Sequence, residues 1–310
     1  MRIVFFGNSE FGLASLEKLH KSPHRIAAVV TNPDKPQGRG RVVSPTPVKR
    51  RALETGLQVL EAESLSSPEF VSKLESLSAD LFIVIAYRIL PERVFTLPPR
   101  GTINLHPSLL PKYRGAAPIQ WAIINGEQTT GLTTFRIDKN IDSGEILLQE
   151  QVAIGSQENF GELSERLAQQ GGDLILKTVA LIEKGEMNSI PQKNQMATPA
   201  PKIKKTDCQI DWTRPARQIF NLIRGLSPYP GAFSALHNKI LKILRADWRD
   251  TGRESASAGE IVIADQTNGL AVQTGGGLLF PTRLQLEGKN IMSVQEFLRG
   301  FRIQTGEKLG

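Results

Sequence analysis

The chain has 310 residues, of which 40% are hydrophobic and 22% are charged. These fractions are close to the averages of soluble globular proteins, so they exclude disordered, collagen-like and membrane classes. A length beyond the roughly 100 to 200 residues of one domain predicts two domains. Cys208 is the only cysteine, which excludes an internal disulfide and a thiolate zinc site and predicts a cytoplasmic protein.

The first residues carry a short apolar run, residues 3–6, which ends at Gly7 and Asn8. A signal peptide or a bilayer span needs a longer apolar run. We therefore expect neither export nor a membrane partner.

The net charge of +7 is concentrated in two stretches of the chain. Residues 32–51 hold six basic side chains against one acidic, and residues 201–253 hold eleven against four. Two separated basic surfaces suit a polyanion, because each phosphate that they neutralise releases a counterion. A solvated basic face would carry the same charge, so charge alone leaves both interpretations open.

Short apolar runs alternate with amphipathic stretches in the first part of the chain, which is typical of buried strands separated by helices. A long amphipathic pattern then begins at Phe160, and Gly185 is placed to end it. This alternation predicts an α/β domain over residues 1–188 with a doubly wound, mostly parallel, Rossmann-like sheet. The predicted strands are residues 2–6, 26–30, 81–86, 102–105 and 132–137.

The rest of the chain has a different pattern. Its prolines, lysines and few apolar residues predict a basic inter-domain linker over residues 189–206. Thr213 is placed to cap a helix that opens at Pro215 and ends at Gly225. Short segments joined by turns then predict a small antiparallel β-barrel, OB-like, in a C-terminal domain of residues 207–310. The segments are residues 239–244, 260–264, 270–274, 278–280 and 283–286.

Polar side chains gather where one predicted strand ends. Asn104 and His106 are two residues apart, so on an extended chain they project to the same side. Asp142 follows the next predicted strand, in a loop that can return to the same edge of the sheet. Open parallel sheets bind their ligands at this edge, so an amide, an imidazole and a carboxylate are expected to converge there.

This trio suits acyl transfer to an amine, which forms a tetrahedral oxyanion and releases a proton from nitrogen. Asn104 can donate to the oxyanion without titrating. His106 can donate as well when protonated, a state that an Asp142 carboxylate would favour by raising the pKa of His106. A histidine at a strand end is more often structural, and position alone leaves that alternative open.

The sequence around the trio resembles the signature of the folate-dependent formyltransferases. The matching runs are NLHPSLLP at residues 104–111 and RGAAPIQ at residues 114–120. The resemblance implies that Asn104, His106 and Asp142 are the catalytic residues and that 10-formyltetrahydrofolate is the cosubstrate. The residues that it implies for folate binding are Ser108, Leu109, Leu110 and Pro111.

A basic loop indicates the methionyl-tRNA branch of this family. Residues 31–41 are TNPDKPQGRGR and resemble the insertion with which this branch reaches the tRNA acceptor stem. This resemblance implies tRNA contacts by Lys35, Arg39 and Arg41. Residues 225–233 and 287–300 resemble the second, tRNA-binding domain of the branch.

The activity that this resemblance implies is transfer of the formyl group of 10-formyltetrahydrofolate to the amino group of methionyl initiator tRNA, for translation initiation. We expect a monomer. One segment departs from the family pattern, because residues 86–91 are AYRILP, one residue shorter than usual and without the usual glycine. Arg88 is then expected to face either solvent or the folate tail.

Two other functions share part of this evidence. A formyltransferase acting on an amino sugar nucleotide would use the same trio without the basic loop. A tRNA-binding protein on a decayed scaffold would keep the fold without turnover. The glycines of residues 6–12 lack dinucleotide and P-loop spacing, and the four histidines have no metal-ligand spacing, so we expect no NAD, ATP or metal.

Overall fold

A computed structural model describes residues 1–37, 42–251 and 256–310. The chain divides into two compact units. The first unit comprises Met1–Ala116, Thr130–Val152 and Ser164–Ala200. The second unit comprises Ala117–Thr129, Ala153–Leu163 and Pro201–Gly310.

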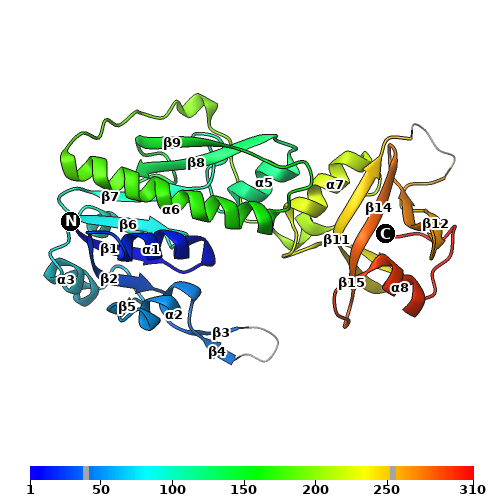
Figure 1. Cartoon of the computed structure of the whole chain (residues 1–310), viewed down its shortest axis with the longest axis horizontal. Helices are drawn as coiled ribbons and strands as arrows, with labels where there is room; N and C mark the ends of the chain where they lie inside the picture. The colour runs from blue at the N-terminus through cyan, green and yellow to red at the C-terminus, as the bar shows by residue number, and fades with distance from the viewer. Residues whose placement is uncertain (38–41, 252–255) are drawn as a thin grey trace. The chain divides into compact units, whose positions relative to one another are not determined.

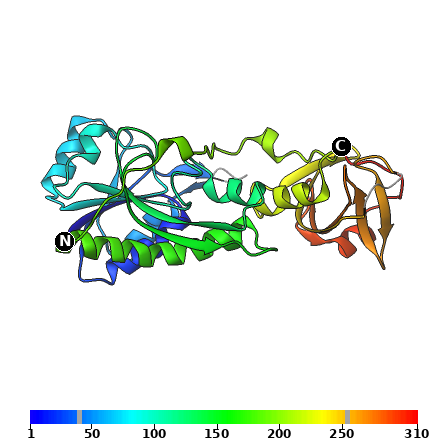
Figure 2. The same ribbon diagram turned by 90° about the horizontal axis from the view of Figure 1, so that it is seen from above.

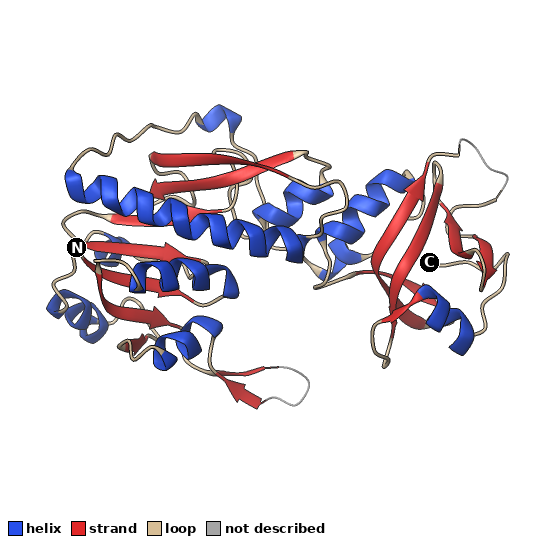
Figure 3. Cartoon of the chain, viewed as in Figure 1, coloured by secondary structure: helices blue, strands red, loops and turns tan. Residues whose placement is uncertain are grey.

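A seven-stranded sheet forms the centre of the first unit, with the strand order β5-β2-β1-β6-β7-β8-β9 (Figures 1 and 3). The strands from β5 to β7 pair in parallel, whereas β7 and β8 pair antiparallel. The sheet is therefore mostly parallel, as predicted. Its strands are β1 (Arg2–Gly7), β2 (Arg25–Thr31), β5 (Val59–Glu61), β6 (Leu81–Ile85), β7 (Thr102–His106), β8 (Thr129–Arg136) and β9 (Ile146–Ala153).

Helices cover both faces of this sheet (Figure 2). On one face, Phe70 and Leu74 of α3 pack in a cluster with Phe6 and Phe82 of the sheet. On the other face, α1 contacts α6, which ends before Gly185 at φ 72° as the sequence predicts. The helices of the unit are α1 (Leu13–His20), α2 (Pro47–Glu54), α3 (Pro68–Ser76), α4 (Glu92–Phe95) and α6 (Phe160–Lys184), with the 3-10 turns η1 (Glu10–Gly12) and η2 (Asn194–Met196).

A two-stranded hairpin follows β2. It consists of β3 (Lys35–Gln37) and β4 (Val42–Ser44), which pair antiparallel with Lys35 opposite Ser44. The hairpin occupies the basic loop identified in the sequence. Arg39 and Arg41 lie outside the residues that the structure describes.

The second unit is built on an antiparallel sheet in which β11 and β14 run side by side as long strands (Figure 1). The predicted segments 278–280 and 283–286 are one continuous strand, β14. The class of this domain is confirmed, while closure into an OB-like barrel stays a prediction. Its elements are η3 (Lys205–Cys208), β10 (Ala232–Leu236), β11 (Lys239–Arg249), β12 (Ile261–Asp265), β13 (Gly269–Gln273), β14 (Leu278–Leu286) and β15 (Met292–Ser293), with helices α5 (Pro118–Ile124), α7 (Ala216–Gly225) and α8 (Val294–Gly300).

Two earlier parts of the chain belong to the second unit, so each unit is made of more than one stretch of sequence. Gly225 lies against α5, where an added Cβ would come within 2.6 Å of the Ile124 side chain. The buried Arg224 donates to the carbonyls of Gly155 and Glu158 over 3.2 and 3.3 Å. Close packing and a buried cation thus hold these residues to α7.

The stretch predicted as a linker also divides between the units, at Ala200 and Pro201. Its first part is hydrogen-bonded to the first unit, through backbone bridges at Ile190 and Pro199. The predicted cap of α7 is wrong. Pro215 is the N-cap residue, and the Thr213 hydroxyl instead donates to Asp211 over 2.6 Å.

Two isoleucines near the end of β6 test the packing of the first unit. Ile85 is fully buried, whereas Ile89 is 75% exposed. We expect Ile85→Ala to lower the free energy of unfolding by about 2 to 5 kcal/mol, because it leaves a cavity in the core. Ile89→Ala should change it by less than about 0.5 kcal/mol. Urea unfolding followed by circular dichroism measures both, and equal effects would contradict this packing.

Candidate active site

Asn104 and His106 lie at the C-terminal end of β7, on the edge where ligands bind in open α/β sheets. In the register, Asn104 lies between Val84 of β6 and Phe135 of β8. Asn104 is partly exposed, and among the described residues its side-chain amide has no hydrogen bond. It is therefore available to a ligand.

The imidazole of His106 is buried, with 5% of the residue exposed. Its Nε2 lies 2.8 Å from the backbone carbonyl of Tyr113. Because a carbonyl oxygen can only accept, Nε2 carries the proton and donates it. The other ring nitrogen, Nδ1, lies 3.6 Å from the Oδ2 atom of Asp142. The imidazole and the carboxylate thus lie close together, at the end of the strand that also carries Asn104.

The position of Asp142 depends on a hydrogen bond to its carboxylate and on the conformation of its loop. Its Oδ2 atom accepts the backbone N–H of Gly115 over 2.8 Å, and its own φ is 51°, a left-handed conformation that aspartate tolerates better than most residues. The loop turns on Asp138, which accepts the Ser143 hydroxyl over 2.8 Å. Gly144 then passes so close to Arg136 that an added Cβ would lie 1.7 Å from its carbonyl oxygen. Only glycine permits this approach.

Burial lowers the pKa of His106 below its ordinary value of 6.5. The Asp142 carboxylate and the Tyr113 carbonyl raise this pKa, but burial is the larger influence. Asp142 therefore raises this pKa as expected, but burial outweighs the effect of the carboxylate. The lowered pKa favours the neutral ring, in which Nδ1 carries a lone pair.

Comparison with known proteins shows the family of this chain. A formyl transferase family model matches residues 1–179, and the C-terminal domain model of the formyl transferases matches residues 202–302. The chain belongs to the formyl transferase family. The family predicted from the NLHPSLLP and RGAAPIQ runs is confirmed.

Curated relatives in this family match the chain over nearly its whole length. The methionyl-tRNA formyltransferase of Desulforamulus reducens is 43% identical, with 100% of this chain and 98% of that protein covered. That of Porphyromonas gingivalis is 44% identical, with 98% and 97% covered. Among solved structures, the N-formyltransferase from Helicobacter canadensis, in complex with folinic acid and dTDP-3-aminofucose, aligns with a TM-score of 0.65 at 18% identity over 90% of this chain and 98% of that one. This likeness shows the shared fold.

The formyl transferase segment predicted to contact folate is partly internal. Ser108 is fully buried, and its hydroxyl donates to the Lys112 carbonyl over 2.6 Å. Leu110 is buried as well, whereas Leu109 and Pro111 are partly exposed. The folate role of this segment stays a prediction, and Leu109 and Pro111 are the members with surface to offer a ligand.

Arg88 does not extend freely into solvent. Its guanidinium donates to the carbonyls of Ala62 and Glu63, the latter over 3.1 Å, and lies 5.4 Å from the centre of the Tyr87 ring. The shortened segment is thus tied to the chain that follows β5. Lys35, the described member of the predicted tRNA-binding set, is exposed on β3.

Sequence reasoning missed the Tyr113 carbonyl and the Gly115 N–H, which orient His106 and Asp142. Both are backbone groups, so residue type carries little sign of them. The glycine in the RGAAPIQ run is the one available signal, since its φ of 124° and its approach to Ala200 exclude a side chain.

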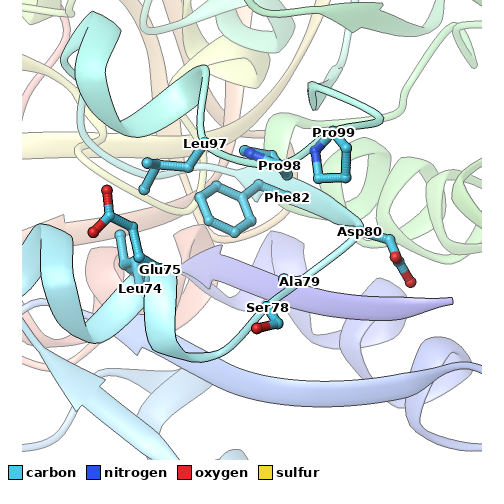
Figure 4. A pocket seen from close by; sticks show the side chains of 9 residues that line it. All are labelled: Leu74, Glu75, Ser78, Ala79, Asp80, Phe82, Leu97, Pro98 and Pro99. Carbon is cyan, nitrogen blue, oxygen red and sulfur yellow. The ribbon is translucent and has the colours of Figure 1, made fainter.

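A cavity of about 420 Å³ lies elsewhere in the first unit, where the Phe82 ring lies near Leu74 and Leu97 (Figure 4). Asp80, which lines the cavity, directly precedes β6, whereas His106 is the last residue of β7, which runs parallel to β6. The cavity therefore lies at the edge of the sheet opposite to His106. The trio stays the candidate site. Among the described residues no cluster of His, Cys, Asp or Glu could hold a metal, and no helix could span a membrane.

The titration of His106 tests the electrostatics of this site. We expect its pKa below 6.5, and lower still in Asp142→Asn, because the carboxylate is the larger of the two influences that raise it. Nuclear magnetic resonance of labelled histidine measures both values. The unfolded ring takes up its proton at a higher pH than the folded one. The contribution of His106 to the free energy of unfolding is therefore fully present above pH 6.5 and is lost as the pH falls below it. A pKa unchanged by Asp142→Asn would contradict the influence assigned to the carboxylate.

Proposed function

We propose that this chain transfers the formyl group of 10-formyltetrahydrofolate to the α-amino group of methionyl initiator tRNA, which is formylated for translation initiation. The observation that carries the proposal is the Asn104, His106 and Asp142 arrangement at the end of β7, with His106 neutral and its Nδ1 toward Asp142. Similarity over nearly the full length to methionyl-tRNA formyltransferases supports this acceptor.

The chemistry follows from the protonation states. The amine nitrogen attacks the formyl carbon, forming the new C–N bond and a tetrahedral oxyanion. The Asn104 amide donates to that oxygen, an interaction of about 3 to 4 kcal/mol in comparable sites. His106 takes the amine proton on Nδ1 and becomes a cation that Asp142 stabilises. Collapse of the intermediate breaks the bond to N10 of the folate, which leaves with a proton supplied from His106.

This assignment changes the role of His106 from an oxyanion donor to the base. A neutral ring whose Nε2–H is engaged by Tyr113 has only Nδ1 to offer the substrate, and Nδ1 accepts. The 3.6 Å gap to Asp142 is longer than a hydrogen bond. A shorter distance between Nδ1 and the carboxylate becomes favourable once Nδ1 carries a proton. The carboxylate therefore favours the protonated ring that forms during transfer.

Folate as the donor has separate support. The Helicobacter canadensis structure with the same fold holds folinic acid, a formylated folate. The same structure holds an amino sugar nucleotide, which makes that acceptor the main rival. An assay with labelled 10-formyltetrahydrofolate and three acceptors separates them: charged initiator tRNA, charged elongator tRNA and an amino sugar nucleotide. Preference for the sugar would overturn the proposal.

Alanine in place of each trio residue tests the mechanism. We expect Asn104→Ala, His106→Ala and Asp142→Ala each to lower turnover at least about a hundredfold, because each removes a contact to the oxyanion or to the transferred proton. Single-turnover rates measure the loss, and circular dichroism checks the fold. Asn140→Ala and His20→Ala are matched controls on exposed residues. Near-normal turnover of folded His106→Ala would remove the proposed base.

The basic hairpin is proposed to contact tRNA, with Lys35, Arg39 and Arg41 as its basic residues. We expect Arg39→Ala to lower formylation of initiator tRNA about tenfold or more, since a charge-assisted contact to nucleic acid is worth about 1 to 3 kcal/mol. If the contact is to phosphate, the log-log salt dependence of tRNA binding becomes shallower by about one unit. Folate binding should not change.

Arg25→Ala provides the control for this test, because Arg25 is an exposed arginine at the opposite end of β2 from the hairpin. Its loss should leave both formylation and the salt dependence unchanged. Equal activity of Arg39→Ala and the parent at several salt concentrations would count against the hairpin as a tRNA contact.

A further inference from the structure

Residues 190–200 lie between the two parts of the chain that the family models match, which end at residue 179 and resume at residue 202. These residues, segment 190–200, belong to the first unit. We propose that Gln192 and Thr198 of this segment are positioning residues that hold Asp142 and His106 in their reactive arrangement. The proposal rests on the function proposed above.

Gln192 holds the loop that carries the catalytic carboxylate. Its side-chain amide nitrogen donates to the backbone carbonyl of Asp142 over 3.0 Å and to that of Gly144 over 2.7 Å. One NH₂ group thus uses both of its protons on the two residues that flank Ser143. Asp142 has a left-handed backbone, a conformation that persists only when surrounding contacts enforce it.

Arg114 fixes the orientation of this glutamine. Its Nη2 and Nε atoms donate to the Gln192 side-chain oxygen over 2.6 and 3.1 Å, and Nη2 also donates to Asn194 over 2.8 Å. A guanidinium can only donate, so the oxygen of Gln192 must face Arg114 and its NH₂ must face the loop. Arg114 is the neighbour of Gly115, whose N–H binds the Asp142 carboxylate.

Thr198 holds the partner of His106 in the same way. Its hydroxyl oxygen accepts the Tyr113 N–H over 2.9 Å, and its carbonyl accepts the Arg114 N–H over 2.9 Å. The Tyr113 carbonyl is the group that receives the His106 proton. Segment 190–200 therefore holds the Tyr113 backbone, which binds the His106 ring, and the loop that carries the Asp142 carboxylate.

Both ends of the segment are anchored by backbone pairing. Ile190 exchanges hydrogen bonds with Ile146 of β9 over 2.8 and 2.9 Å. Ala200, fully buried, donates to the Arg114 carbonyl over 2.6 Å. These hydrogen bonds give the segment a defined path although it has no long helix or strand. A flexible linker would not need such bonds. Among the hydrogen bonds of the described residues, those of Gln192 and Thr198 go to the backbone around His106 and Asp142 and not to the imidazole or the carboxylate, so their role is indirect.

Gln192→Glu tests the proposal in the full-length chain. The carboxylate keeps an acceptor for Arg114 but cannot donate to the two loop carbonyls. We expect kcat to fall about tenfold to a hundredfold, with KM for both substrates changed less than about twofold, since displacement by about 1 Å has such effects. Gln195→Glu makes the same change on an exposed glutamine of the same segment and should leave kcat unchanged.

A second pair of variants examines Thr198. Thr198→Val removes the acceptor for the Tyr113 N–H while keeping the shape of the side chain, and we expect kcat to fall about tenfold. Thr198→Ser keeps the hydroxyl and should retain kcat within about twofold. This pair decides the proposal if Gln192→Glu fails to fold.

A double-mutant cycle separates positioning from a general loss of structure. In the Asp142→Ala background, Gln192→Glu should lower kcat by less than about twofold further, because the group that it positions is gone. Additive losses would overturn the proposal, and so would a rise in KM for tRNA at constant kcat. A parent enzyme that formylates no charged initiator tRNA would instead overturn the proposed function.

Discussion

A hydrogen bond between the buried His106 ring and the Tyr113 carbonyl determines what this site can do. The bond decides which ring nitrogen carries the proton, and burial keeps the ring neutral. Nδ1 is left as a base with Asp142 beside it. In the proposed transfer, the charge that forms on the ring is stabilised by a carboxylate that is already in place, so little reorganisation is needed.

The sheet supplies the rigid part of this arrangement. Asn104 and His106 alternate with buried Leu105 on β7, between a parallel and an antiparallel neighbour. The backbone of such a strand cannot shift without disturbing the sheet on both sides. The carboxylate comes from a loop instead. That loop needs glycine at position 144, and the segment whose N–H binds the carboxylate needs glycine at position 115, because backbone passes against backbone at both positions. Rigid strand and constrained loop together set the distance between base and carboxylate.

The connection between the matched domains therefore has a structural part. Segment 190–200 is hydrogen-bonded to Arg114, Tyr113 and the Asp142 loop, and its ends pair with β9 and with Arg114. Its composition, rich in proline and polar residues, is that of a linker. Polar side chains in such a stretch can form hydrogen bonds with solvent or with the backbone of a distant loop. Composition does not distinguish these two cases.

Much of this protein could be predicted from local pattern. Buried apolar runs located β1, β2, β6 and β7, the glycine after α6 marked its end, and the NLHPSLLP run identified the family. Short strands such as β5 and β10 lacked a strong pattern. What only the tertiary structure decided is the protonation of His106, the merging of two predicted segments into β14, and the use of residues 190–200 at the site. Each depends on burial or on hydrogen bonds between residues far apart in the chain, and neighbouring residues in a sequence do not encode these.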